Sequence, residues 1–273
     1  MTPQTRDFSP LRCIGTSFGY LVATRRDLLM IATPPVIALA LIGTLTTLVV
    51  PEAAITMGDP MQGVPPSVPL AFLMLLVLQI LFYVMFAVAW HRKYLVPGEA
   101  VTVAEALKWR REKTRFLLLL IGIVLLMFLA VFLLSPLVAI ATAVLGPAGF
   151  AAIGLVYVLG LIVFARLSLA LPAAAIGRKE FGLRAAWAAT RRRSAAMFFI
   201  LVLPVLIGLV GAMPVNLLAG VFGAVGLLET ATGIALLALL NEAIRYVAIA
   251  LGVSTLSAAY LELADGHGAP PQS

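Results

Sequence analysis

Six apolar runs, each long enough to cross a membrane, constrain this chain more than any other feature. They lie at residues 28–50, 69–90, 116–134, 150–171, 195–213 and 234–257. A helix of about 20 apolar residues crosses the roughly 30 Å hydrocarbon core of a bilayer. Lipid cannot satisfy backbone polar groups, and the runs lack the alternation of barrel strands. The sequence therefore predicts an all-α, polytopic membrane helix bundle with six transmembrane helices.

The composition excludes an ordinary soluble domain. Of the 273 residues, 62% are hydrophobic and only 11% are charged, whereas a soluble domain has roughly 25% charged residues. A soluble fold of this size cannot hide so much apolar surface from water. A net charge of +7 would suggest nucleic acid in a soluble protein. Here the basic residues lie at the ends of the apolar runs, so we expect no nucleic-acid partner.

The positions of Lys and Arg predict the topology. Seventeen of the 19 basic residues precede the first run or lie between runs two and three or runs four and five. Segments 51–68, 135–149 and 214–233 contain none. Because cytoplasmic loops carry an excess of Lys and Arg, we expect an N-in/C-in protein of a bacterial inner (cytoplasmic) membrane, built from three hairpins.

This topology divides the chain into three parts. We expect a cytoplasmic N-terminal interfacial segment at 1–27, a single transmembrane domain at 28–260 and a cytoplasmic tail at 261–273. Segment 214–233 leaves an alternative open, because it is either an interfacial helix on the outer side or the start of a seventh span. The pair Arg25-Arg26 resembles a twin-arginine export signal, but the run behind it is too long for a signal peptide, so we expect no cleavage.

Basic and aromatic residues precede each odd-numbered run. Ala23-Thr24-Arg25-Arg26 is nearly repeated by Ala189-Thr190-Arg191-Arg192, which suggests an internal repeat of amphipathic helix, span, outer loop and span. Segments 103–115 and 183–193 have helical periodicity, and such basic helices lie in the headgroup plane. They either anchor the protein or recognise anionic lipid. The candidate contacts to lipid phosphates are Arg25, Arg26, Arg110, Arg111, Arg191, Arg192 and Arg193.

Three charged residues lie inside apolar runs, where an ionised group costs roughly 2.5–3.5 kcal/mol. Glu242 and Arg245 are three residues apart, so they share one helix face and can form a structural ion pair. Arg166 lies near the cytoplasmic end of the fourth run, from which its side chain can snorkel to the interface. The alternative is an intramembrane polar site for a lipid headgroup or an ion, built from Arg166, Glu242 and Arg245.

No enzyme motif is present in the sequence, and we expect neither catalysis nor a metal or other cofactor. The 12 acidic residues are scattered, and Cys13 is the only cysteine. His91 and His267 have no second metal ligand at helical spacing. We therefore interpret both as solvated or interfacial histidines.

Two short stretches carry a family resemblance. They are Ala89-Trp90-His91-Arg92 with Leu95, Pro97, Gly98 and Glu99, and Arg166–Ala173 with Ala186-Trp187 and Thr190-Arg191. Over residues 70–260 the chain resembles the membrane domain attached to some glycerophosphoryl diester phosphodiesterases, and related bacterial six-helix inner-membrane proteins of unknown function. The soluble phosphodiesterase domain has no counterpart here, so the resemblance implies a membrane module without that activity. Its family-like positions are His91, Arg92, Arg166, Pro172 and Trp187.

Two functional hypotheses follow from the sequence. The first is a non-enzymatic membrane module that contacts anionic lipid headgroups or a partner protein, with self-association permitted by small residues in the spans. The second is a transporter or flippase-like protein with an intramembrane polar site. A water-accessible cavity at the buried charges would favour the second hypothesis, and a dry, tightly packed bundle would favour the first.

Overall fold

The computed structural model describes residues 8–49, 67–99 and 101–264, and these residues form helices and loops without a strand. The elements are α1 (Pro10–Ala23), α2 (Arg25–Val49), α4 (Ser67–Leu95), α5 (Val103–Leu107), α6 (Arg111–Leu145), η1 (Gly146–Gly149), α7 (Phe150–Ser168), α8 (Ala170–Ala175), α9 (Leu183–Ala189), α10 (Ser194–Ala224), η2 (Leu227–Glu229) and α11 (Ala231–Ala264). The predicted all-α fold class is confirmed.

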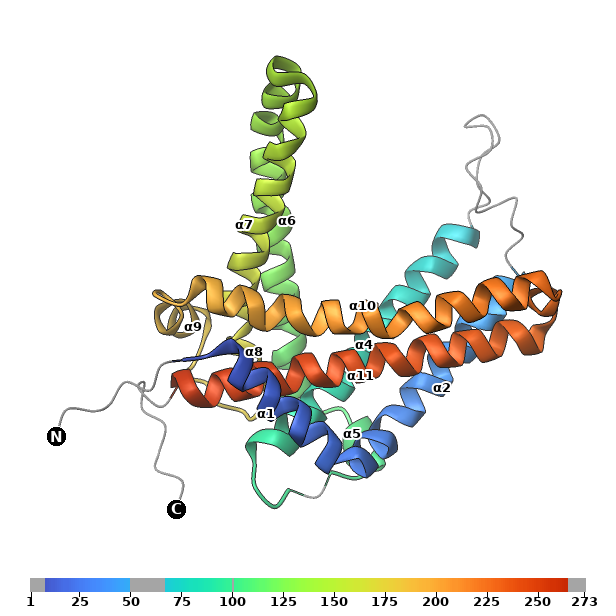
Figure 1. Ribbon diagram of the computed structural model, residues 1–273. Helices are drawn as coiled ribbons and strands as arrows, with labels where there is room; N and C mark the ends of the chain where they lie inside the picture. Colours follow the sequence, from blue (N-terminus) through green and yellow to red (C-terminus); the bar gives the residue numbers. More distant parts are fainter. Residues whose placement is uncertain (1–7, 50–66, 100, 265–273) are drawn as a thin grey trace.

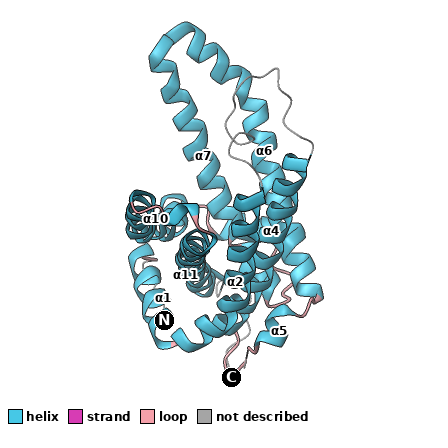
Figure 2. Ribbon diagram, turned by 90° about the vertical axis from the view of Figure 1, so that its right-hand side faces the viewer, coloured by secondary structure: helices cyan, strands magenta, loops and turns pink. Residues whose placement is uncertain are grey.

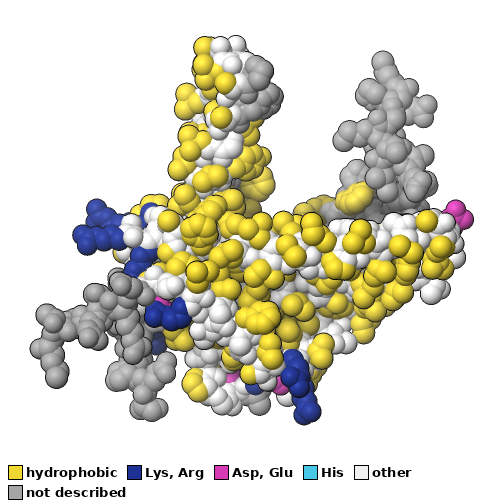
Figure 3. Space-filling model, in the orientation of Figure 1, with side chains coloured by type: hydrophobic (Ala, Val, Ile, Leu, Met, Phe, Trp, Pro, Cys, Tyr) yellow, Lys and Arg dark blue, Asp and Glu magenta, His cyan; other side chains and the backbone are white. Residues whose placement is uncertain are grey.

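Six spans of the described chain are long and apolar enough to cross a membrane: α2, α4, α6, α7 together with α8, α10 and α11. Large apolar side chains are exposed along the outside of these helices, and they cover much of the surface in Figure 3. Such a continuous apolar surface marks contact with lipid. The protein is therefore an integral, multi-pass membrane protein.

Helices α10 and α11 decide between six spans and seven. Helix α10 continues through Pro214 to Ala224, and α11 follows after a short turn. Gly226 takes the left-handed φ of 72° that this turn requires, which glycine adopts without steric cost. At 1.5 Å per residue these helices are about 46 and 51 Å long. Segment 214–233 is thus neither an interfacial helix nor a separate span, and it belongs to the ends of α10 and α11 and the turn between them.

The long helices form three hairpins that diverge from a common end (Figure 1). Helix α2 pairs with α4, α6 with α7, and α10 with α11. Helix α11 also packs against α1, α2 and α4, and in Figure 2 it lies between α10 and the α2–α4 pair. The α6–α7 hairpin projects away from the other two hairpins in both views.

The core lies where the hairpins converge. Its buried side chains come from the first half of α2, the second half of α4, the α7–α8 junction and the second half of α11. Phe86, Trp90 and Tyr246 form its aromatic centre, with ring centroids 6.0 Å apart for Phe86–Trp90 and 5.1 Å apart for Phe86–Tyr246. Beyond this core the hairpins expose large apolar side chains, which is the surface that contact with lipid requires.

A short helix precedes the first long helix of each hairpin, with α1 before α2, α5 before α6 and α9 before α10. We call the end of the bundle that carries α1, α5 and α9 the basic end. Thr24 and Thr190 follow α1 and α9, and each hydroxyl donates to a carbonyl four residues earlier, at 2.7 and 2.8 Å. These contacts explain the near copy of sequence at the two positions. The predicted single helix at 103–115 is wrong, because Lys108–Arg110 separate α5 from α6.

Side-chain contacts tie the short helices to the long ones. The Arg12 guanidinium on α1 pairs with the Glu262 carboxylate on α11 at 2.9 Å. A further ion pair, at 3.0 Å between the Lys93 ammonium and Asp27, joins the long helices α4 and α2. The Tyr20 hydroxyl donates to the carbonyl of Lys93 at 3.0 Å. The predicted outer loop at 51–66, His267 and the chain beyond Ala264 lie outside the described residues.

Candidate functional site

The basic end carries the arginines that the sequence identifies as lipid contacts. Arg25 and Arg26 begin α2, and Arg191 and Arg192 lie between α9 and α10. All four side chains are exposed, and none forms an ion pair within the described part of the chain. In Figure 3 Lys and Arg side chains lie in separate groups at the left and at the lower edge of the molecule, and an acidic group marks the far end of the α10–α11 hairpin. The charge asymmetry predicted from sequence is therefore a property of the folded surface.

The other candidate lipid contacts differ in their surroundings. Arg193 is half-buried, and its guanidinium lies 5.2 Å from the centroid of the Phe8 ring. Arg110 is paired with Glu105, whereas Arg111 is exposed at the start of α6. Arg191 and Arg192 are thus better placed than Arg110 to bind a phosphate.

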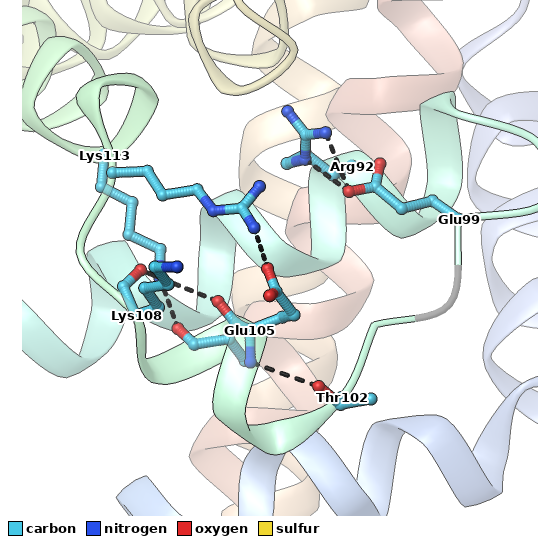
Figure 4. Close-up of polar contacts among 8 residues, drawn as sticks. Arg92, Glu99, Thr102, Glu105, Lys108 and Lys113 are labelled. Atoms are coloured by element: carbon cyan, nitrogen blue, oxygen red, sulfur yellow. Dashed lines mark hydrogen bonds and ion pairs between the residues drawn. The ribbon is translucent and has the colours of Figure 1, made fainter.

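The segment between α4 and α6 is held by the polar contacts that Figure 4 shows. The Nζ atom of Lys113 donates to the carbonyl oxygens of Ala106 and Lys108, each at 2.5 Å. The hydroxyl of Thr102 accepts from the backbone N–H of Glu105 at 3.3 Å, which caps the start of α5. A buried lysine therefore satisfies the last carbonyls of α5 and fixes this helix against α6.

Arg166 turns toward the basic end and holds α9. Its Nε atom donates to the hydroxyl of Thr190 at 3.1 Å, and its Nη2 atom donates to the carbonyl of Trp187 at 2.8 Å. The guanidinium also stacks on the indole of Trp187, 3.4 Å from the ring centroid. Arg166 extends toward the basic end, as the snorkelling interpretation predicts. Its partners are protein groups, and these contacts hold α9 beside α7.

The remaining family-like positions contribute to packing. Trp90 donates from Nε1 to the hydroxyl of Ser254 at 2.8 Å, and His91 Nδ1 lies 2.7 Å from the hydroxyl of Ser257. These contacts fasten α4 to α11. His91 is only 1% exposed, so the prediction of a solvated or interfacial histidine is wrong. Pro172 is buried within α8.

Arg92 also has a partner near the basic end. Its guanidinium pairs with the Glu99 carboxylate at 2.8 Å, which bridges the end of α4 to the loop before α5. The ion pair appears at the edge of the cluster in Figure 4. The motif Trp90-His91-Arg92 thus connects α4 to its neighbours through three consecutive side chains.

Glu242 and Arg245 form the ion pair that their spacing predicts, with 3.0 Å between Arg245 Nη1 and Glu242 Oε1. They lie near the middle of α11, about 20 Å from its first residue. The Glu242 side chain is 12% exposed and that of Arg245 is 34% exposed. Glu242 Oε2 is buried without a hydrogen-bond partner among the described residues. Arg166 binds α9 instead of this pair, so the predicted group of three does not form one site.

A crevice of about 400 Å³ lies between the α7–α8 segment and the α10–α11 hairpin, with α4 as its floor. Most of its lining is apolar. The lining residues with polar side-chain atoms are Tyr83, His91, Ser168, Asn241 and Arg245. The crevice reaches one charge that the sequence places inside the membrane, which the sequence alone could not show. Asn241 lies one helical turn before Arg245 on α11, and both residues line the crevice.

Comparisons of the chain with protein-family models, with curated proteins and with solved structures give no match.

Proposed function

We propose that the protein is a non-enzymatic module of a bacterial inner (cytoplasmic) membrane, whose basic end faces the cytoplasm and binds anionic lipid headgroups. The observation that carries the proposal is a set of exposed arginines at the basic end, Arg25, Arg26, Arg191 and Arg192, which form no ion pair with the residues that the structure describes. Guanidinium groups bind phosphate oxygens through two parallel hydrogen bonds. Basic residues close to an anionic leaflet each contribute roughly 1 kcal/mol to its attraction.

Aromatic side chains support the same placement. Trp109 and Trp187 are 43% and 41% exposed, and both lie within a few residues of basic clusters at the basic end. Tryptophan favours the interface between hydrocarbon and water, where its ring is covered and its N–H reaches a polar group. An arginine cluster beside such a tryptophan is therefore positioned at headgroup depth.

The orientation rests on the charges at the two ends. The positive-inside rule places the Lys- and Arg-rich end in the cytoplasm. The turn between α10 and α11 carries Glu229 and no basic residue. Because the cytoplasmic leaflet is the one with a negative surface potential, orientation and lipid contact support each other.

Replacing Arg191 and Arg192 by glutamine is expected to weaken the protein's preference for anionic lipid by up to about thirtyfold, from the contribution of two basic residues. The full chain would be placed in phosphatidylcholine bilayers of graded phosphatidylglycerol content. Immobilisation of spin-labelled phosphatidylglycerol next to the protein would be measured. The loss of preference for anionic lipid should be largest at low salt, because added salt screens the attraction between arginine and phosphate.

The matched control is the double variant Arg12→Gln/Arg110→Gln, which removes the same charge from arginines that already form ion pairs. We expect a smaller effect from this control. Equal effects of the two double variants would contradict recognition at Arg191 and Arg192. No effect of either would point to an acidic partner protein as the occupant of these arginines.

A transporter or flippase-like function is the second candidate, and the crevice favours it because it reaches Arg245. Transport of a polar substrate requires water in that crevice. Its mainly apolar lining favours a lipid occupant over water. We therefore prefer lipid contact to transport as the proposed function.

A further inference from the structure

The crevice between the hairpins has the dimensions of a ligand site. Its volume of about 400 Å³ lies within the roughly 300–1,000 Å³ of small-molecule pockets. Along α10 its lining runs from Met197 to Ala212, which is about 22 Å at the helical rise. It is therefore elongated and suits a hydrocarbon chain.

Small residues on α10 and α11 shape one wall of the crevice. Gly208, Pro204 and Gly252 line it and let the two helices approach closely. A Cβ atom on Gly208 would lie 2.7 Å from the Cβ atom of Ala248. The wall is thus formed by tightly packed backbone, and the opening between hairpins is a feature of the fold.

Arg245 is the charged side chain in this mainly apolar lining. Arg245 has one hydrogen bond in the described structure, from Nη1 to Glu242, whereas a guanidinium has five N–H donors. Its side chain is the more exposed of the pair and lines the crevice, and Glu242 does not. Asn241 lies one turn away and offers amide donors. Hydrogen-bond donors of two side chains therefore face an apolar cavity.

The charge balance decides which acceptor fits. The Glu242 carboxylate already compensates the positive charge of Arg245. A second anion would leave a net negative charge in the hydrocarbon, which is costly. An uncharged acceptor, such as a carbonyl oxygen, accepts from the guanidinium without adding charge.

We propose that the crevice binds an uncharged long-chain lipid whose carbonyl oxygen accepts hydrogen bonds from Arg245 and Asn241. The hydrocarbon chain lies along α10 between the diverging hairpins. This intramembrane site is separate from the basic end, and it does not depend on headgroup binding there.

The probe is a long-chain methyl ester with a photoactivatable diazirine in its chain. The full chain is reconstituted in ether-linked phosphatidylcholine, because that host lipid has no carbonyl group to compete. We expect crosslinks to peptides of α10 and α11. The matching alkane, which has no hydrogen-bond acceptor, should crosslink about tenfold less, the loss expected for a hydrogen bond to a charged donor.

Two matched variants locate the site. Val205 and Val210 are both exposed on α10, but only Val205 lines the crevice. Val205→Trp should fill the crevice and reduce crosslinking about tenfold, whereas Val210→Trp should leave it unchanged. The double variant Glu242→Gln/Arg245→Met keeps the site uncharged and removes the guanidinium donors, so it should reduce the preference for the ester over the alkane.

Three results would overturn the proposal. Equal crosslinking of the ester and the alkane would remove carbonyl recognition. Stronger crosslinking by the matching carboxylate probe would remove the preference for an uncharged acceptor. Unchanged crosslinking of a Val205→Trp variant that melts at the wild-type temperature would place the probe elsewhere.

Discussion

Replacing Trp90 by alanine is expected to lower the free energy of unfolding by about 3–5 kcal/mol, the usual cost of emptying a buried tryptophan site. Trp90 is fully buried at the convergence of the hairpins. Its ring stacks on Phe86 with centroids 6.0 Å apart and meets Tyr20 edge-on at 5.8 Å. Alanine would also leave the hydroxyl of Ser254 without this donor, so both packing and a hydrogen bond between α4 and α11 are lost.

Denaturation of the purified protein in detergent would measure this effect. Trp109→Ala is the matched control, because Trp109 is exposed and its indole N–H donates to Thr114 in the nearby first turn of α6. We expect that control to remain within about 1 kcal/mol of wild type, as exposed substitutions usually do. Similar losses for the two alanine variants would contradict a core centred on Trp90.

Arg166→Lys is expected to release α9 from α7, even though it keeps the positive charge. Arginine makes two hydrogen bonds and a stacking contact here, at Thr190 and Trp187. Lysine has no planar fork to make them together. The free energy that holds α9 against α7 is expected to fall by about 2–3 kcal/mol, because hydrogen bonds to a charged group and a cation–π contact are lost.

Amide hydrogen exchange of α9 reports this loss directly, because a detached helix exchanges through local opening. Exchange at 184–190 should accelerate in Arg166→Lys and Arg166→Gln alike. Arg184→Gln, which removes an exposed arginine from the same helix, should leave it near the wild-type rate. Full protection in the lysine variant would show that charge alone holds α9 in place.

The number of membrane spans could be predicted from sequence, because a lipid bilayer fixes the length of each spanning helix and cannot satisfy unpaired backbone groups. The helix ends could not be predicted as well. Helices α6, α10 and α11 extend beyond their apolar runs, since Pro136 and Pro214 do not end them and polar residues continue the helical turns. In membrane helices neighbouring groups tolerate proline better than in water.

The contacts of the buried charges depend on how the hairpins diverge, which the sequence does not encode locally. Glu242 and Arg245 pair within one helix, so their spacing alone predicts the contact. Arg166 has equally apolar neighbours in the sequence, yet its partners are Trp187 in α9 and Thr190 directly after α9. His91 looks isolated in sequence, but Ser257 of a distant helix lies beside it. The repeated Ala-Thr-Arg-Arg element and the family-like stretch that includes Thr190-Arg191 both draw attention to Thr190 in the sequence.

Cysteine accessibility in intact cells tests the central claim, a six-span protein with one basic cytoplasmic end. Cys13 is buried, and burial raises the pKa of its thiol to about 12, so the native chain gives a low background. Single cysteines would replace Gly146 and Glu229 at the far turns, Arg25 and Arg192 at the basic end, and Asn241 in the crevice. A membrane-impermeant thiol reagent is expected to label 146 and 229 from outside, and 25, 192 and 241 should stay unlabelled. Labelling of 25 or 192 from outside would contradict the topology, and labelling of 241 would favour a water-filled transport route.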